Sequence, residues 1–298
     1  MRAEYREEPC RSALNRVRGM PFAWSLNPYM GCAHRCTFCY VRAFEARADR
    51  PFDDRYGASI RVKTNVAEVL RRELARSSWQ REPVAIGAAT DPYQPAEGRY
   101  RLTRACIEAL ADAANPFSLI TRGPLVVRDV DVLAEAARRA KVSVAFSIPT
   151  LDHEIWQRTE PGTAPPRQRL RALSVLVEAG IAASVGMAPI LPGLSDRPEL
   201  LADVVRAARE AGATAVWANL LYLRHGTREH FLAALERDWP DLLPDYERLY
   251  RRGAYLPQNE AAPVRERVRK LAREHGIRDR RRVRLAPPPE AEQLALVM

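Results

Sequence analysis

The sequence predicts an α/β fold, an open partial (β/α)6 barrel of the TIM type followed by a helical appendage. Short apolar segments alternate with longer amphipathic segments from about residue 60 to residue 223. This alternation is typical of repeated βαβ units and a parallel sheet. Six strands are expected, fewer than the eight that close a TIM barrel. The polar motifs follow these strands, where sheets of this kind carry their chemistry.

Each strand is expected where an apolar segment is bounded by turn residues. The first covers 24–31 and leads into a cysteine-rich loop. The others are expected over 83–91, 117–122, 141–150, 181–193 and 213–223. Helices with one apolar face are expected over 65–79, 102–114, 127–140, 166–180 and 196–212. Gly180 and Gly212 end the last two helices, at a position where glycine is favoured.

The sequence pattern changes after residue 224. Segment 224–276 predicts two or three helices with breaks at proline, which we expect to cover the open side of the barrel. A basic run occupies 278–285, and a proline-rich tail follows it. We therefore divide the chain into a barrel with an N-terminal extension, a helical appendage and a tail, which cover 1–223, 224–285 and 286–298.

The composition is that of an ordinary globular protein. The 298 residues are 47% hydrophobic and 28% charged, which separates the chain from the disordered and collagen-like classes. No segment approaches the ~18–20 apolar residues that a transmembrane helix needs, and the N-terminus lacks the apolar core of a signal peptide. A cytoplasmic protein with no membrane partner is expected.

Basic residues outnumber acidic ones. The chain has 47 Lys and Arg against 37 Asp and Glu, a formal net charge of +10. Its lysines are Lys63, Lys141 and Lys270, so the other basic residues are arginines. Two interpretations stay open: a genome composition that favours arginine codons, or an electrostatic surface for polyanions such as nucleic acid.

Three of the five cysteines are close together in the chain: Cys32, Cys36 and Cys39 have the spacing C-x3-C-x2-C in GCAHRCTFCYVRAF. A structural zinc site takes four ligands, usually in two separated pairs, and no second pair follows. His34 could be a fourth ligand, but it lies inside the first spacing. Three thiolates in one short loop favour an iron–sulfur cluster with one iron left open. Cys106 lies in an apolar helical segment, where a buried structural thiol is expected.

This cysteine loop resembles the signature of the radical S-adenosylmethionine (SAM) enzymes. That signature is C-x3-C-x-aromatic-C after the first strand of a partial (β/α)6 barrel, and Phe38 supplies the aromatic residue. The resemblance covers roughly residues 20–220. It implies a [4Fe–4S] cluster on Cys32, Cys36 and Cys39, with SAM on the fourth iron. It also implies reductive cleavage of SAM to a 5′-deoxyadenosyl radical, with an electron donor of the flavodoxin or ferredoxin type.

Further segments resemble the spore photoproduct lyase-related branch of that superfamily, also labelled DNA repair photolyase-like. They include TDPYQPAE (90–97), ITRGPLVVRDVDVL (120–133), SIPTLD (147–152) and APILPG (188–193). One departure is Ala88, where photoproduct lyases carry a hydrogen-donor cysteine just before the polar pair that ends the second strand. The resemblance therefore implies a relative whose substrate differs from that of the strict lyase.

The same resemblance implies which residues contact SAM. Thr90 and Asp91 would bind its amino group, although Asp91 before a proline also suits an Asx-type turn. Arg122 would bind the carboxylate or the ribose, unless it is a solvated surface arginine. The full set of implied positions is Phe38, Tyr40, Thr90, Asp91, Arg122, Ser147, Glu160, Met187 and Ala188.

The remaining implied positions serve the nucleoside part of SAM. Ser147 would contact the ribose, and Glu160 would contact ribose hydroxyls or shape its own loop. Met187 and Ala188 would offer backbone groups and apolar surface to adenine. Tyr40 would present its backbone to adenine.

Other polar and aromatic residues have less specific patterns. Tyr93, Gln94 and Arg128 point towards the expected substrate position or pack within loops, and both interpretations stay open. Trp217 and Asn219 are expected as core and strand-end residues. The histidines beyond the cysteine loop show no metal-site or catalytic spacing: His153, His225, His230 and His275.

Three functions are therefore compared. The leading one is a radical SAM enzyme that acts on DNA or another nucleic-acid-like substrate. The second is a metal- or cluster-stabilised nucleic-acid-binding protein without catalysis. The third is a radical SAM enzyme that acts on a small molecule or peptide.

The C-terminal residues offer a separate hypothesis. Gln293–Val297 reads QLALV, which resembles the short motif by which bacterial DNA-processing proteins bind the replication sliding clamp. A linear peptide on a proline-rich spacer suits docking into a preformed groove. The alternative is an apolar C-terminus that packs on the last helix.

Overall fold

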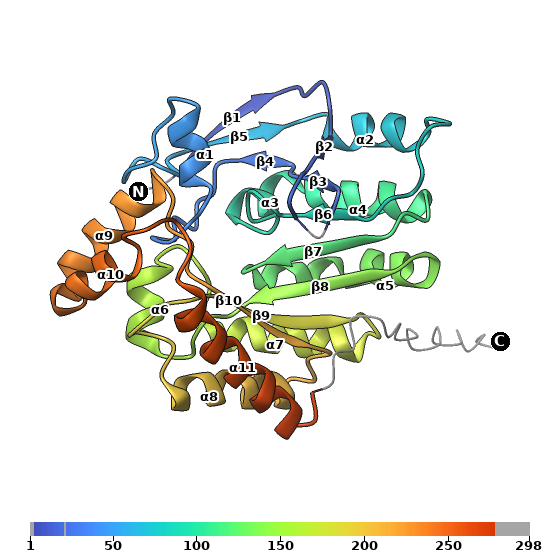
Figure 1. Ribbon diagram of the computed structural model, residues 1–298. Coiled ribbons are helices and arrows are strands. Elements are labelled where there is room, and N and C mark those ends of the chain that lie inside the picture. The colour runs from blue at the N-terminus through green and yellow to red at the C-terminus, as the bar shows by residue number, and fades with distance from the viewer. Residues whose placement is uncertain (1–2, 21, 278–298) are drawn as a thin grey trace.

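The computed structural model describes residues 3–20 and 22–277, and it has the expected α/β architecture (Figure 1). Its main sheet has the strand order β10-β9-β8-β7-β6-β3-β2. Six of these strands are parallel and follow one another in chain order: β3 (Trp24–Leu26), β6 (Val84–Ile86), β7 (Phe117–Thr121), β8 (Val142–Ser147), β9 (Ala183–Ile190) and β10 (Val216–Leu220). The antiparallel strand β2 (Leu14–Arg16) extends the sheet at β3.

The first expected strand, 24–31, is wrong as a single element. Trp24–Leu26 belongs to the main sheet, but Tyr29–Met30 forms β4 in a second sheet of order β1-β5-β4. Between them, Pro28 has no N–H for a strand ladder. The Asn27 side chain instead accepts hydrogen bonds from the backbone of the loop after β6. The other strands of this second sheet are β1 (Glu4–Glu8) and β5 (Ser59–Lys63).

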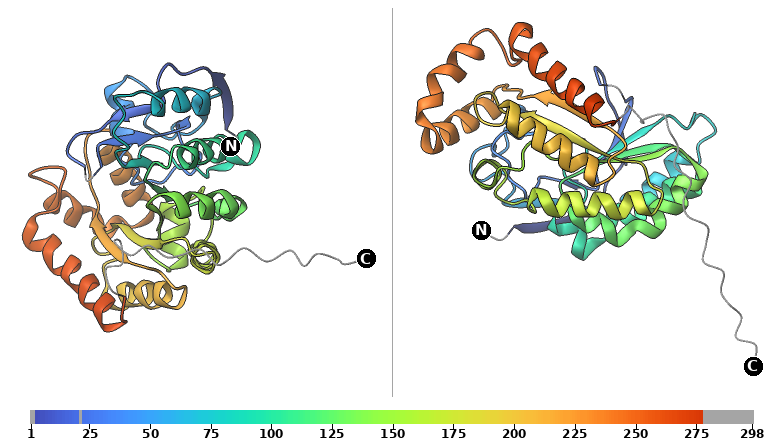
Figure 2. Two further views of the ribbon diagram at one scale, coloured as in Figure 1. Left: turned by 90° about the vertical axis from the view of Figure 1, so that its right-hand side faces the viewer. Right: turned by 90° about the horizontal axis from the view of Figure 1, so that it is seen from below.

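The helices that alternate with the strands lie along the outer face of the sheet (Figure 2). The expected ones are present with shorter bounds: α2 (Val66–Leu74), α4 (Leu102–Asp112), α5 (Val130–Arg139), α7 (Pro166–Glu178) and α8 (Pro198–Glu210). A 3-10 turn, η1 (Pro124–Asp129), precedes α5. Their apolar faces and the strands form the main core. This packing supports the carboxyl ends of the strands, where the site lies.

Short helices that the sequence analysis missed occur in the loops at that end of the sheet. They are α1 (Arg42–Arg47) after the cysteine loop, α3 (Pro95–Tyr100) after β6 and α6 (His153–Thr159) after β8. Each has only six or seven residues. Helices of this length are too short to show a clear apolar period in the sequence.

The C-terminal segment is helical, as expected, and it packs in two places. Helix α11 (Gln258–Glu274) lies against β10 and α8. Helices α9 (Thr227–Asp238) and α10 (Leu243–Leu249) share a second apolar cluster with Cys36 and Phe38 of the cysteine loop. The appendage therefore also supports the site. No helix of the described residues is long and apolar enough to span a membrane. The tail and its Gln293–Val297 motif lie outside the described residues.

Candidate active site

The cysteine loop joins β4 to α1, and hydrogen bonds from two other segments hold it. Gln94 Oε1 accepts from the Ala33 N–H at 3.0 Å, and Gln94 Nε2 donates to the Gly31 carbonyl at 3.1 Å. The Thr37 N–H donates to the Thr159 carbonyl at 2.9 Å. Gln94 thus packs against the cysteine loop, one of the two roles the sequence left open.

Arg42 holds the end of the same loop from inside the protein. Its side chain is fully buried, and Nη1 donates to the Phe52 and Asp53 carbonyls at 2.5 and 2.6 Å. Its guanidinium lies 4.7 Å from the ring centroid of Tyr56. The Tyr56 hydroxyl in turn lies 3.7 Å from Cys39 Sγ. Segment 52–57 is therefore fixed against the cysteines.

Gly57 makes the tightest approach to the cysteine loop. Its φ is +77°, and a Cβ there would lie 2.2 Å from the Cys32 carbonyl oxygen. We expect Gly57→Ala to displace Cys32 and to lower the iron bound per chain, because alanine is strained in this backbone region and has no space. Gly253→Ala is the matched control, since nothing lies within 4 Å of its Cβ. Iron content after anaerobic reconstitution measures the effect, and equal iron in the two variants would contradict this geometry.

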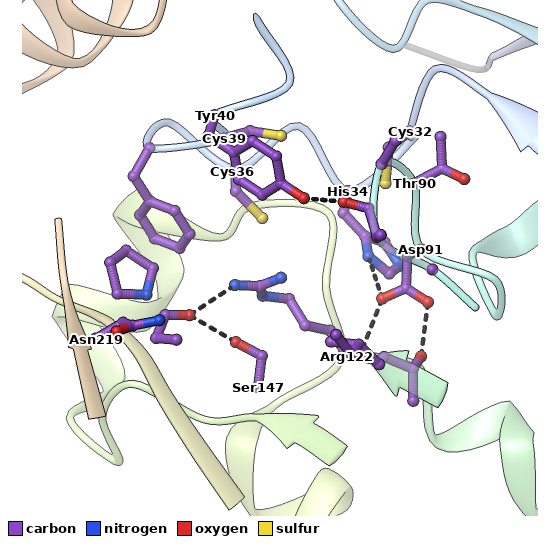
Figure 3. Close-up of a pocket in the computed structure, with 18 of the residues that line it drawn as sticks. Cys32, His34, Cys36, Cys39, Tyr40, Thr90, Asp91, Arg122, Ser147 and Asn219 are labelled. Atoms are coloured by element: carbon purple, nitrogen blue, oxygen red, sulfur yellow. Dashed lines mark hydrogen bonds and ion pairs between the residues drawn. The ribbon is translucent and has the colours of Figure 1, made fainter. Parts of the chain in front are cut away.

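A cavity of about 290 Å³ lies at the carboxyl ends of the strands (Figure 3). The three motif cysteines line it from one side. The SAM-binding positions named from the sequence also line it, apart from Glu160 and Met187: Phe38, Tyr40, Thr90, Asp91, Arg122, Ser147 and Ala188. Residues far apart in the chain, from the cysteine loop to β9, thus share one space.

The thiols fit an iron–sulfur cluster. All described cysteines are free, and Cys32, Cys36 and Cys39 face the same cavity. Burial raises the pKa of Cys36 and of Cys39, which keeps their thiols protonated without a metal. No three His, Cys, Asp or Glu side chains in the described ranges are grouped as ligands of a single metal ion. In a cluster, each thiolate binds a different iron, so the three sulfur atoms need not meet at one point. The three cysteines fit a cluster because they line the same cavity.

Asp91 joins the cysteine loop to the ends of β6 and β7. Its Oδ1 accepts from Thr121 Oγ1 at 2.6 Å. The same oxygen accepts from the Tyr93 N–H at 2.9 Å, and this second bond forms the expected Asx-type turn. Its Oδ2 accepts from the Arg122 N–H at 2.6 Å and lies 3.3 Å from His34 Nδ1. Burial opposes ionisation, but His34 and these donors lower the pKa of Asp91 to about 2. The carboxylate is therefore committed to contacts within the chain.

His34, the possible fourth metal ligand inside the first cysteine spacing, is engaged in other contacts. Its ring lies between Asp91 and the Cys32 thiol. Burial alone would lower its pKa, but Cys32 and Asp91 raise it to about 10. The resulting positive charge lowers the pKa of Cys32 against the effect of burial. His34 therefore positions the first cysteine of the motif.

Arg122 is not a solvated surface arginine. Its side chain is 20% exposed, and its Nε donates to Glu160 Oε1 at 2.6 Å. Its Nη2 donates to the Ala188 carbonyl at 3.1 Å, and Ser147 Oγ donates to the same carbonyl at 2.7 Å. Burial opposes the charge, but Cys36 and Glu160 raise the pKa of Arg122. It is a fixed cation on the cavity wall (Figure 3).

Glu160 lies behind Arg122 rather than at the cavity surface. Its other carboxylate oxygen accepts from Arg169 Nη2 at 2.7 Å, and both side chains are buried. Arg169 also donates to the Ser147 carbonyl at 2.8 Å. Arg169 is not among the site residues predicted from the sequence, although its place on the buried face of an expected helix beside Leu170 and Leu173 was a signal.

Two residues of β10, Trp217 and Asn219, also line the cavity, and Asn219 stands near the end of the strand, as expected. The Trp217 ring covers Gly186 of β9, where an added Cβ would lie 2.5 Å from the ring. Asn219 is exposed beside an irregularity in the β10–β9 register. That irregularity turns Asn219 towards the cavity, and no sequence signal marks it (Figure 3).

Tyr93 and Arg128 pack away from the cavity. Tyr93 Oη donates to Asp129 Oδ2 at 3.0 Å, and Arg128 Nη2 lies 2.8 Å from Glu97 Oε1. This buried ionic network joins α3 to η1. Their loop-packing interpretation is the one that the geometry supports. Tyr40, by contrast, extends its hydroxyl across the cavity to the Ala88 carbonyl.

Comparisons with known proteins agree with this geometry. The family model for the Radical SAM superfamily matches residues 26–205. The "Uncharacterized protein Rv2578c" of Mycobacterium tuberculosis (strain ATCC 25618 / H37Rv) is 42% identical over 291 residues, which cover 97% of this chain and 85% of that protein. The "Radical SAM Nalpha-GlyT isomerase" of Pseudomonas phage M6 is 27% identical over 170 residues, which cover 56% of this chain and 33% of that protein.

The fold is also similar to solved structures. Spore photoproduct lyase complexed with dinucleoside spore photoproduct superposes with a TM-score of 0.68 at 15% identity. The superposition covers 91% of this chain and 79% of that chain. At this identity the likeness concerns the fold alone.

Proposed function

This chain belongs to the radical SAM superfamily, whose members use a [4Fe–4S] cluster and SAM, and we propose that its substrate is a nucleic acid. Membership makes it an enzyme, which removes the alternative of a binding protein without catalysis. The observation that supports the site best is the shared cavity of three thiols and one fixed cation, Arg122. Cys32, Cys36 and Cys39 would hold the cluster with one iron left for SAM, and the bound, reduced cluster would supply the electron for SAM cleavage.

The chain's own residues would orient SAM within this cavity. Arg122 Nε and Nη2 already donate hydrogen bonds to Glu160 and to the Ala188 carbonyl. In the described part of the chain, no acceptor contacts the third nitrogen, Nη1. That nitrogen would bind the SAM carboxylate. Ser147 and Ala188, which are already hydrogen-bonded to each other, would lie beside the ribose and adenine. Asp91 would act as a positioning residue, because its oxygens already hold His34 and β7.

Three observations support a nucleic acid as the substrate. The chain carries a net charge of +10, and almost all of its basic residues are arginines. The arginine guanidinium binds phosphate well. The cavity that would hold SAM opens at the end of a sheet that is not closed by pairing among the described strands. A structurally similar protein is a lyase that binds a dinucleoside photoproduct. The methyl group of Ala88 donates no hydrogen atom, so photoproduct repair is not assigned.

The test compares nucleic-acid binding and SAM cleavage in the same anaerobic preparation. We expect the holoenzyme to bind labelled oligonucleotides with an affinity that falls steeply with salt, because each phosphate contact contributes about −0.7 to −0.9 to the slope of log K against log salt. We also expect oligonucleotides to increase 5′-deoxyadenosine formation from SAM. Salt-independent or absent binding, with SAM cleavage stimulated instead by peptides or small molecules, would contradict the proposal.

The superfamily reaction needs an electron donor, and we propose one of the flavodoxin or ferredoxin type. The sliding-clamp hypothesis for Gln293–Val297 stays a prediction from the sequence.

A further inference from the structure

In the part of the chain that the structure describes, most of the exposed large apolar side chains gather around the cavity. Among the described residues they are Met20, Tyr40, Phe44, Val175 and Tyr255. Met20 and Tyr40 line the cavity itself. Phe44 packs edge-on against Tyr40, with ring centroids 5.8 Å apart. Of the five, Val175 lies apart, on helix α7.

Tyr255 belongs to the same region through Tyr222. Tyr222 lines the cavity, and its ring centroid lies 4.6 Å from that of Tyr255. The two residues form an antiparallel bridge, and Leu223 N–H donates to the Ala254 carbonyl at 2.8 Å. Tyr255 is nevertheless 75% exposed. One face of its ring is thus supported while much of the side chain remains available to a ligand.

The two aromatic pairs are parts of one continuous surface. Gly226, shortly after Tyr222, approaches α1 so closely that a Cβ there would lie 2.8 Å from Ala46 Cβ. Thr227 Oγ1 donates to the Cys39 carbonyl at 3.1 Å. The segment that carries Tyr222 therefore packs directly beside the helix that carries Phe44. We call the surface formed by Tyr40, Phe44, Tyr222 and Tyr255 the aromatic rim.

Unpaired arginines accompany the aromatic rim. The Arg47 guanidinium lies 5.9 Å from the ring centroid of Phe44. Arg224, Arg251 and Arg252 are exposed and stand near Tyr222 and Tyr255 in the chain. None of these four guanidinium groups pairs with a carboxylate of the described residues.

Exposed aromatic rings beside unpaired arginines suit a single-stranded nucleic acid. Bases stack on aromatic side chains whatever their sequence, and arginines bind the phosphates between them. Bases inside a duplex are already stacked, so they cannot stack on the rim unless they leave the duplex. An acidic peptide would satisfy the arginines but would leave the rings without a matching flat partner.

We propose that the aromatic rim binds unpaired nucleotides of a single-stranded nucleic acid and leads one of them into the cavity. This inference rests on the proposed function and specifies the form of its substrate. Stacking would use Phe44 and Tyr255, and Arg47, Arg224 and Arg251 would contact phosphates. DNA and RNA share this chemistry, so the test includes a strand of each.

The test uses the anaerobic holoenzyme and its Phe44→Ala/Tyr255→Ala double variant, with Val175→Ala as the matched control. Labelled oligothymidylate and oligouridylate of about 12 nucleotides, a duplex of equal length and an oligoglutamate peptide serve as probes. We expect the wild type to bind single strands more tightly than the duplex. The double variant should bind them about 10-fold or more weakly, because stacking one base accounts for roughly 5- to 150-fold in affinity. The control should bind as the wild type does.

Several results would overturn the inference. If the double variant binds single strands as tightly as the wild type, the rim is not the binding surface, while the proposed function stands. Equal or tighter binding of the duplex would also leave the proposed function standing and refute the single-stranded form. Preferential binding of oligoglutamate would refute the rim as a nucleic-acid surface. Failure of wild type to bind any of the nucleic acids would overturn both proposals.

Discussion

Replacing Cys32, Cys36 or Cys39 with alanine should remove most of the bound iron and abolish SAM cleavage. The three thiols line one cavity, and each would bind a different iron, so no neighbour can compensate for a missing thiolate. Iron, acid-labile sulfide and 5′-deoxyadenosine, measured after anaerobic reconstitution, report the effect. We expect the loss to be nearly complete in each single variant.

Cys106→Ala is the matched control for this series. Cys106 is fully buried in α4 within the main core, and burial raises its pKa, as for the thiols of Cys36 and Cys39. It does not line the cavity. The variant should keep its iron and its SAM cleavage. An equal loss of iron in Cys106→Ala would mean that the cluster ligands are misassigned.

Arg169→Met should cause a large loss of stability. Arg169 and Glu160 form a fully buried ion pair at 2.7 Å, and Arg169 also binds the Ser147 carbonyl. Removal of one partner leaves Glu160 with only Arg122, and breaking a buried pair costs about 3–5 kcal/mol. A lower denaturation midpoint in urea, together with weaker SAM binding through a displaced Arg122, measures this effect.

Arg206→Met provides the same chemical change at an exposed pair. Arg206 and Asp203 are paired on the surface of α8, where both side chains are about half exposed. Exposed pairs contribute roughly 0–1 kcal/mol, so this variant should unfold nearly as the wild type does. Similar midpoint shifts in Arg169→Met and Arg206→Met would show that the buried pair does not support the site.

The parallel sheet and the cysteine site could be predicted because both are local patterns. Each strand is a short apolar segment next to an amphipathic helix, and the three cysteines are close together in the chain. The division of the first strand could not be predicted in the same way. It depends on Asn27, whose side chain binds the backbone at Ala89 and Thr90, more than sixty residues away.

The parts of the site that the sequence did not predict depend on contacts between distant segments. The sequence suggested a SAM contact and an Asx-type turn for Asp91, but not that its oxygens are also held by Thr121, Arg122 and His34. Asn219 enters the cavity through a register irregularity in β10, which leaves no periodic signal. Sequence patterns identify residue types and strand ends, but the hydrogen-bond partners at those ends follow from tertiary packing.

The central claim is that Cys32, Cys36 and Cys39 hold a cluster that cleaves SAM in this cavity. Its most direct test is the anaerobically reconstituted wild type, reduced in the presence of SAM, with metal content and 5′-deoxyadenosine measured on the same sample. We predict about four irons per chain and formation of 5′-deoxyadenosine that is lost in Cys36→Ala. One zinc per chain, with no 5′-deoxyadenosine under the same conditions, would contradict the claim.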